Sequence, residues 1–159
     1  MRKLWNRSNQ AVWSVSTMDE SGATNMNIAT YVTAVSLEPK LMMVAVYKDT
    51  KTLENLKCSN RCLLQLLSID LAPVVRVCGK FSGKKIDKIK RLQKRYEIRE
   101  QSGLPYFALS AGYMEITIID WLAIQGDHEI AVGEVTAHVN LNNNEVLTTN
   151  YLRKQRIIR

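Results

Sequence analysis

The sequence predicts a mainly β protein built around a closed or nearly closed, mostly antiparallel barrel. About six segments are rich in β-branched and aromatic residues and are separated by short turn-like stretches. Two long strand patterns, Met114–Ile124 and His128–Leu141, are joined by only three residues, Gln125-Gly-Asp127. Few segments have helical spacing, and no repeat or linker divides the 159 residues, so we expect one domain over residues 1–159.

The first half of the chain supplies most of the expected strands. These are Ala11–Met18, Met26–Val35, Leu41–Tyr47 and Arg61–Leu67. The turn chemistry of Asp19–Gly22 predicts that the first two strands form a hairpin. Leu41–Tyr47 is apolar without alternation, which is typical of a central strand covered on both faces. A short helix is expected over Thr52–Cys58.

Most of the net charge of +7 comes from one segment. Lys84–Arg99 contains eight lysines and arginines against Asp87 and Glu97, and the remaining chain is close to neutral. The apolar residues that recur in it at helical spacing are Ile86, Ile89, Leu92 and Tyr96. The pattern predicts a basic helix that is either a solvated face packed on the core or a surface for an acidic partner or cofactor. Its single aromatic residue and the lack of a recognised motif argue against nucleic-acid binding.

Four other features carry further expectations. Leu71–Cys78 is apolar and fits either a helix or a strand, and Leu104–Tyr106 reopens extended structure. Gly133, inside a strand pattern, suggests close approach of another backbone or of a ligand. The basic tail, Leu147–Arg159, either lies on a neighbouring subunit or is loose.

Composition excludes several classes of protein. The longest apolar run, Leu41–Val46, is far shorter than the ~20 residues that cross a bilayer. The N-terminal MRKLWNRSNQ lacks the apolar stretch of a secretory signal, so we expect a cytoplasmic protein without membrane association. The cysteines, Cys58, Cys62 and Cys78, form no metal-type pair; we expect reduced, mostly buried thiols and no metal site.

The stretch Thr24–Thr52 suggests a ligand. Hydroxyl and cationic residues gather in the loop after Leu41–Tyr47, where a helix is expected to begin, and the unpaired N–H groups of a helix start attract phosphate. The expected donors to a phosphorylated ligand are Asn25, Asn27, Thr30, Lys48, Thr50, Lys51 and Thr52. The alternative is an ordinary β-hairpin with a polar loop, because no glycine-rich phosphate fingerprint is present.

Taken together, several segments resemble the flavin reductase-like family of FMN-binding split barrels over almost the full chain. The specific one is GDHEIAVGEV at residues 126–135, in which Gly-Asp-His precedes a Gly-Glu-Val strand. The others are VWSVST, NMNIATYVTAVSLEP, YKDTKTLENL, SGKKIDKI and LPYFALSAGYMEITI. Departures from the family pattern occur at Met26, Ile28 and Lys40. The resemblance implies a six-stranded antiparallel split β-barrel of Greek-key type with a few flanking helices.

The resemblance also implies a set of FMN-binding residues. Those that line the flavin would be Asn25, Asn27, Ala29, Thr30 and Tyr31. Those that hold its phosphate would be Lys48, Thr50, Lys51 and Thr52, with Lys88 reaching in from the basic segment. His128 would lie beside the isoalloxazine ring or the incoming nicotinamide, together with Gly126 and Asp127.

The implied function is that of an FMN flavoprotein, an NAD(P)H-dependent flavin reductase. NADH or NADPH would reduce bound FMN, which passes electrons to free flavin, a metal complex or a protein acceptor. The alternative is a flavoredoxin-like electron carrier that does not use pyridine nucleotide directly. The hydride chemistry belongs to the cofactor, so no side chain is expected to be a catalytic acid or base. The resemblance further implies a homodimer with FMN at its interface, and the basic segment suggests an acidic redox-partner protein.

Overall fold

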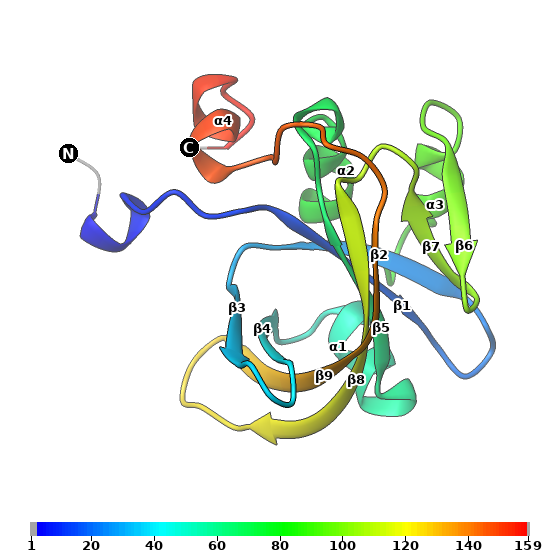
Figure 1. Cartoon of the computed structure of the whole chain (residues 1–159). Helices are drawn as coiled ribbons and strands as arrows, with labels where there is room; N and C mark the ends of the chain where they lie inside the picture. Colours follow the sequence, from blue (N-terminus) through cyan, green and yellow to red (C-terminus); the bar gives the residue numbers. More distant parts are fainter. Residues whose placement is uncertain (1–2, 159) are drawn as a thin grey trace.

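A curled antiparallel sheet forms the body of the molecule in the computed structural model, which describes residues 3–158. Seven strands lie in the order β2-β1-β5-β8-β9-β4-β3, a non-meander order of the Greek-key kind, because β5 pairs with β1 and β9 with β4 (Figure 1). The strands are β1 (Trp13–Met18), β2 (Thr24–Ala29), β3 (Val32–Ser36), β4 (Leu41–Tyr47), β5 (Arg61–Leu66), β8 (Gly112–Leu122) and β9 (His128–Asn140). The expected antiparallel split barrel is confirmed.

The two edge strands of this sheet, β2 and β3, are consecutive in the chain. Only Thr30 and Tyr31 separate them, so the sheet must curl until its edges come together. Two register shifts between β8 and β9, at Glu115/Ile116 and Ile118/Asp120, add the bending that long strands need to wrap around a core. The prediction of a single strand over Met26–Val35 is therefore wrong. The chain forms two strands there, β2 and β3, which are separated by Thr30 and Tyr31 where the sheet closes.

The strand count differs from the expected six for a second reason. Part of the basic segment is extended: β6 (Ile98–Gln101) pairs with β7 (Leu104–Phe107) in a separate hairpin. Its turn is Ser102-Gly103, both with positive φ. The long basic helix expected over Lys84–Arg99 is thus wrong. Only α3 (Lys88–Leu92) is helical, and it begins where the Asp87 side chain accepts a hydrogen bond from the Lys90 N–H at 2.9 Å.

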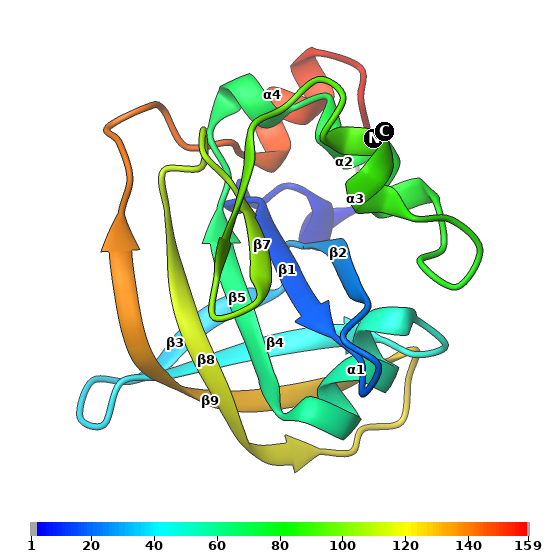
Figure 2. The same cartoon turned by 90° about the vertical axis from the view of Figure 1, so that its right-hand side faces the viewer.

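Helices cover the barrel at two places (Figure 2). The helix α1 (Lys51–Ser59) follows β4 directly, near the predicted position. The ambiguous segment resolves into a 3₁₀ turn (Ile69–Leu71) and the helix α2 (Val74–Lys80). With α3 and α4 (Thr149–Lys154), α2 gathers at the opposite end of the barrel from α1. Among residues 3–158, no helix is long and apolar enough to cross a membrane.

The core has two main parts. One fills the barrel interior, around Val44, Leu64 and Ile116. The other lies beneath α2 and α4, and it includes the fully buried Leu147 and Leu152. The C-terminal segment through residue 158 is thus packed on its own chain, so the expectation of a loose tail is wrong.

Two smaller expectations have clear outcomes. Another chain segment does approach Gly133 closely: a Cβ there would clash with the Ile116 side chain and would lie 3.2 Å from the Thr117 carbonyl oxygen of the paired strand. All three cysteines are free; Cys62 and Cys78 are buried and Cys58 is exposed. Burial raises the pKa of Cys62 and of Cys78 to about 12, so both stay protonated thiols.

Candidate functional site

Two adjoining cavities lie where β2 and β4 end and α1 begins. The larger has a volume of about 470 Å³ and is closed on its far side by α2, the loop after it and Ile157-Ile158. The smaller, about 180 Å³, lies beside the β2–β3 link and His128. Four residues line both cavities: Asn27, Ile28, Tyr47 and Thr52. The two hollows therefore form one elongated site with two different ends.

Most of the predicted site residues meet in this site. Those in the larger cavity are Asn25, Asn27, Thr50, Lys51, Thr52 and Lys88. Those in the smaller cavity are Asn27, Ala29, Thr30, Tyr31, Thr52 and His128. Lys48, Gly126 and Asp127 line neither. The Lys48 ammonium donates to the Gly126 carbonyl at 2.7 Å, so this lysine braces the loop that carries His128.

The start of α1 is held in place by buried polar side chains. Thr50 is its N-cap and accepts from the Leu53 N–H at 3.2 Å. The Asn25 amide donates to the Thr52 hydroxyl at 3.1 Å, and both side chains are almost completely buried. Within residues 3–158 the backbone N–H groups of Lys51 and Thr52 have no protein acceptor. These groups present a fixed positive end to the larger cavity, which favours an anion there.

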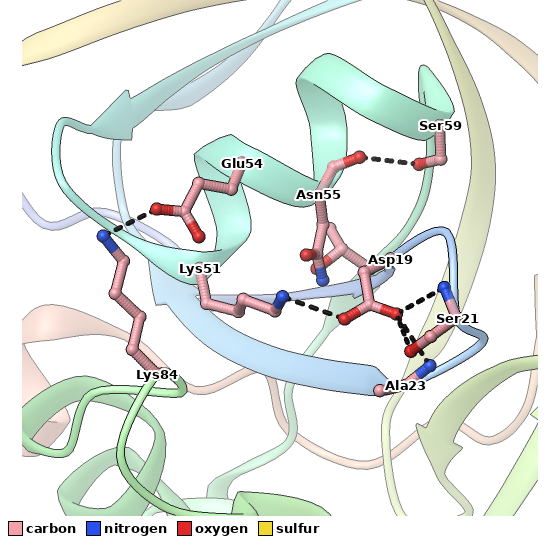
Figure 3. A network of polar contacts seen from close by, with 9 residues as sticks. Asp19, Ser21, Ala23, Lys51, Glu54, Asn55, Ser59 and Lys84 are labelled. Atoms are coloured by element: carbon pink, nitrogen blue, oxygen red, sulfur yellow. Dashed lines mark hydrogen bonds and ion pairs between the residues drawn. The ribbon is translucent and has the colours of Figure 1, made fainter.

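Like Lys48, the other two predicted lysines, Lys51 and Lys88, are engaged by the protein itself. The Lys51 ammonium lies 2.9 Å from the Asp19 carboxylate, which also accepts from the backbone N–H groups of Ser21 and Ala23 (Figure 3). These contacts, with Lys51 the largest cause, hold the pKa of Asp19 well below its usual range. Lys88 is buried and donates to the carbonyls of Met26 at 3.0 Å and Cys78 at 2.7 Å, and burial lowers its pKa.

Two other cations of the larger cavity were missed by the sequence analysis. Arg76 and Lys80 lie four residues apart on α2, on the side that faces the cavity, and both are exposed. Neither has an ion pair or a side-chain hydrogen bond within residues 3–158, so both are available to a ligand. The signal for them was the four-residue spacing, but it is readable only once the segment is known to be a helix.

The smaller cavity ends in a cluster of three aromatic rings. The His128 ring lies edge-on to Tyr31, with centroids 5.6 Å apart, and to Tyr47 at 5.2 Å. His128 Nδ1 lies 2.6 Å from the Asp127 carboxylate, and that bond lowers the pKa of Asp127. The contact assigns a proton to Nδ1 and leaves Nε2 for a ligand. Tyr47 was not predicted as a site residue, although it lines both cavities.

The site is polarised along its length. Its α1 end offers N–H donors and free cations, its middle offers Asn25, Asn27 and Thr52, and its other end offers Ala29 and aromatic rings. The Asn25 Oδ1 is buried against Gly83 without any hydrogen-bond donor among the described residues. An anionic tail, a hydroxylated chain and a flat apolar ring fit these three parts.

Comparisons with known proteins agree with this description. The protein-family model with the description "Flavin reductase like domain" matches residues 5–156 of this chain. No protein with a curated description matches the chain.

Among solved structures, a protein from Sinorhizobium meliloti that is described as an oxidoreductase superposes with a TM-score of 0.78 at 25% identity. The match covers 91% of this chain and 48% of that protein's chain. This chain therefore spans about half of that protein. An NADH:FAD oxidoreductase from Streptomyces globisporus has a TM-score of 0.79 at 21% identity, over 92% of this chain and 85% of its own. An FMN-binding protein from Thermus thermophilus has a TM-score of 0.76 at 20% identity, over 89% of this chain and 76% of its own. Because the family model matches residues 5–156, which is nearly the whole chain, the chain belongs to the flavin reductase-like family.

Proposed function

We propose that this protein is an oxidoreductase that binds FMN in the two adjoining cavities and reduces it with NADH or NADPH. The observation that carries the proposal is the polarity of the site, with the α1 N-terminus and two free cations at one end and the ring cluster of Tyr31, Tyr47 and His128 at the other. Membership of the family supports it, as do the flavin-related names of the similar structures. The electrons then pass to free flavin, a metal complex or a protein acceptor.

The phosphate is assigned to the α1 end of the larger cavity. The N–H groups of Lys51 and Thr52 donate to it, and Arg76 and Lys80 reach it from α2 on the opposite wall. An arginine and a helix N-terminus are both suited to phosphate oxygens. The Lys51 ammonium is paired with the Asp19 carboxylate, so the uncompensated positive charge at this end comes from Arg76 and Lys80.

The ring is assigned to the smaller cavity. When bound, the flavin supplies the hydride-accepting chemistry, and the protein positions it and excludes water. Ala29 leaves room beside the backbone, and Tyr31 closes the wall of the cavity. Lys88 does not line this cavity; it donates to the carbonyls of Met26 and Cys78 beside the larger one, so it fixes β2 against α2. His128 offers Nε2 to the incoming nicotinamide, with Asp127 fixing the orientation of its imidazole.

A homodimer is part of the proposal. Large apolar side chains are exposed on or beside β3 and around the end of β8: Val35, Leu37, Ile119, Leu122 and Ile124. These side chains form two groups, because β9 and β4 lie between β8 and β3 in the sheet. Exposed apolar side chains on β3 offer a surface to a second copy. Since β3 follows Tyr31 directly in the chain, a second copy on β3 would exclude water from the ring end of the site. Light scattering of the purified protein should report twice the 18.1 kDa chain mass, and each chain should bind one flavin.

The direct test uses purified protein under nitrogen. After loading with FMN and removal of the excess, NADH and NADPH are added in turn, and the visible flavin absorption is followed. Bleaching by either donor supports the proposal. A protein that retains no flavin contradicts it. If the protein retains flavin that neither NADH nor NADPH bleaches, but that a reduced redox protein does bleach, the protein is an electron carrier and the proposed reductase activity is wrong.

A further inference from the structure

A cavity that is larger than either part of the candidate flavin site lies elsewhere in the molecule. Its volume is about 800 Å³, and it shares no lining residue with the two flavin cavities. It opens where β1 and β8 begin and where β5 and β9 end. Residues that pair side by side across these strands line it: Trp13, Leu66, Gly112 and Asn140. We name this hollow the mouth cavity.

The floor of the mouth cavity is apolar and partly aromatic. Trp13, Met114 and Val135 are half-buried there and pack on the core inside the barrel. Gly112 adds no side chain to the floor, and a Cβ at this position would clash with the Val139 carbonyl oxygen. Indole and thioether groups both favour contact with an aromatic ring. The floor therefore suits a flat aromatic ligand.

The loop after β9 forms one wall of the mouth cavity and is fixed by its own side chains. The Asn142 amide donates to the Ser110 carbonyl at 2.8 Å, and its Oδ1 accepts from the Asn144 N–H at 2.9 Å. The Asn144 amide donates to the Asp70 carboxylate at 3.1 Å. The wall is thus formed without a ligand, as is usual for small-molecule sites, whose volumes are roughly 300–1,000 Å³.

The remaining polar groups of the lining are not used by the protein. They take part in no ion pair and no side-chain hydrogen bond among residues 3–158, and they are Lys40, His138, Asn140 and Asn143. No aspartate or glutamate lines the cavity. An ammonium group and amide donors without a competing carboxylate favour a carboxylate ligand.

Lys40 comes to the cavity from the turn between β3 and β4. Its carbonyl accepts from the Val135 N–H at 3.0 Å, which places Lys40 against β9, three residues before His138. Three residues of a strand span about 10 Å, and the lysine side chain is long and flexible. One ligand can therefore contact Lys40 and the polar groups near the end of β9.

We infer that the mouth cavity binds a small aromatic carboxylate of one or two fused rings. The ring lies on the floor beside Trp13 and Met114, and the carboxylate meets Lys40 and the free amides. This site goes beyond the proposed function, because it has no residue in common with the flavin cavities. Trp13 pairs with Ala29, which lines the ring end of the flavin site. The ligand and FMN thus occupy neighbouring but separate places and do not compete.

The test uses 1-naphthoate as the probe and titration calorimetry as the measurement. Two compounds serve as controls: 1-naphthalenemethanol keeps the ring without the charge, and cyclohexanecarboxylate keeps the charge without the aromatic ring. Wild-type protein should bind 1-naphthoate about tenfold more tightly than either control, because only 1-naphthoate uses both parts of the cavity. The affinity should be the same within about twofold in the presence of excess FMN.

Matched variants locate the carboxylate. Lys40→Met removes the ammonium and keeps most of the side chain, and Lys94→Met removes an exposed lysine outside the cavity. Lys40→Met should weaken 1-naphthoate binding about tenfold and change 1-naphthalenemethanol binding less than about twofold, because it loses a bond to a charged group. Lys94→Met should bind both compounds like wild type. Thermal unfolding checks that both variants keep the fold.

Several results would overturn the inference. They are no binding of 1-naphthoate at about 1 mM, equal weakening in the two variants, and displacement of 1-naphthoate by FMN, which would place the probe in the flavin site. A lower mass of Lys40→Met in light scattering, with unchanged 1-naphthoate affinity, would make the cavity a contact between two copies instead. None of these results bears on the proposed function, which fails if the protein retains no flavin, whatever the naphthoate titration shows.

Discussion

The two ends of the candidate flavin site are built in opposite ways. At the α1 end the polar side chains are buried and bonded to one another, Asn25 to Thr52 and Asn55 to Thr17. At the His128 end, Tyr31 and Tyr47 are each 52% exposed and meet the imidazole only through ring edges. One end is part of the folded core and the other is carried on its surface. Substitutions should therefore change stability and binding together at the α1 end, and should change the chemistry alone at the His128 end.

The largest effect is expected from Thr52→Val. The substitution keeps the shape of the side chain but leaves the buried Asn25 amide without an acceptor. Loss of one partner in a buried pair costs about 1–3 kcal/mol of the free energy of unfolding. Urea unfolding should show this loss, and FMN binding should weaken in parallel. Thr52→Ser keeps the oxygen and is the control; equal stability of the valine and serine variants would contradict the coupling of fold and site.

The second prediction separates charge from the buried network. Arg76→Ala combined with Lys80→Ala removes two exposed cations, so the free energy of unfolding should stay within ~0.5 kcal/mol of wild type. Binding of FMN should weaken by about 10- to 100-fold, because each cation bonds a charged phosphate. Riboflavin, which has no phosphate, should bind equally well to both proteins. A parallel loss of riboflavin affinity would show that α2 contacts the ring rather than the phosphate.

At the opposite end, His128→Ala should act on catalysis. The histidine bonds to the exposed Asp127 carboxylate and to no buried group, so stability and FMN affinity should change little. The kcat/KM for NADH should fall about tenfold, since the nicotinamide loses a positioning contact. Stopped-flow reduction of the loaded protein measures this. His128→Gln, which retains a polar nitrogen, should recover part of the rate, and a full rate in the alanine variant would remove His128 from the reaction.

The smallest effect concerns acid stability. In the folded protein the pKa of Asp19 lies below its ordinary value of 3.8, so its contacts stabilise the fold above that pH. This contribution is lost as the pH falls from about 4 toward the lowered pKa. Asp19→Asn should therefore destabilise the protein slightly at neutral pH and make its unfolding midpoint less sensitive to acid. Thermal melts between neutral pH and pH ~3 compare the two slopes; identical slopes would mean that the ion pair with Lys51 contributes nothing.

Local signals in the sequence predicted much of the fold. Alternating and β-branched segments predicted the strands. Successive side chains of a strand point to opposite faces of the sheet, so every second residue lies on the same face and the pattern is visible within a few residues. The helix expected over Thr52–Cys58 begins one residue earlier, at Lys51, where Thr50 is the N-cap. The break at Thr30-Tyr31 and the hairpin β6–β7 were not predicted. Both depend on partners distant in the chain, which override the local pattern.

The candidate site shows the same division. The sequence by itself determined the mainly β class and the short helix after β4, and most of the residues that it predicted for the site line one of the two cavities. Only the tertiary structure decided which cations are free. Lys48 and Lys88 bond to backbone carbonyls and Lys51 to Asp19, whereas Arg76 and Lys80 stay unpaired among residues 3–158. The physical reason is that the residue type alone gives the charge of a side chain. Whether that charge is available to a ligand depends on which oxygen atoms the fold brings within hydrogen-bonding distance of it.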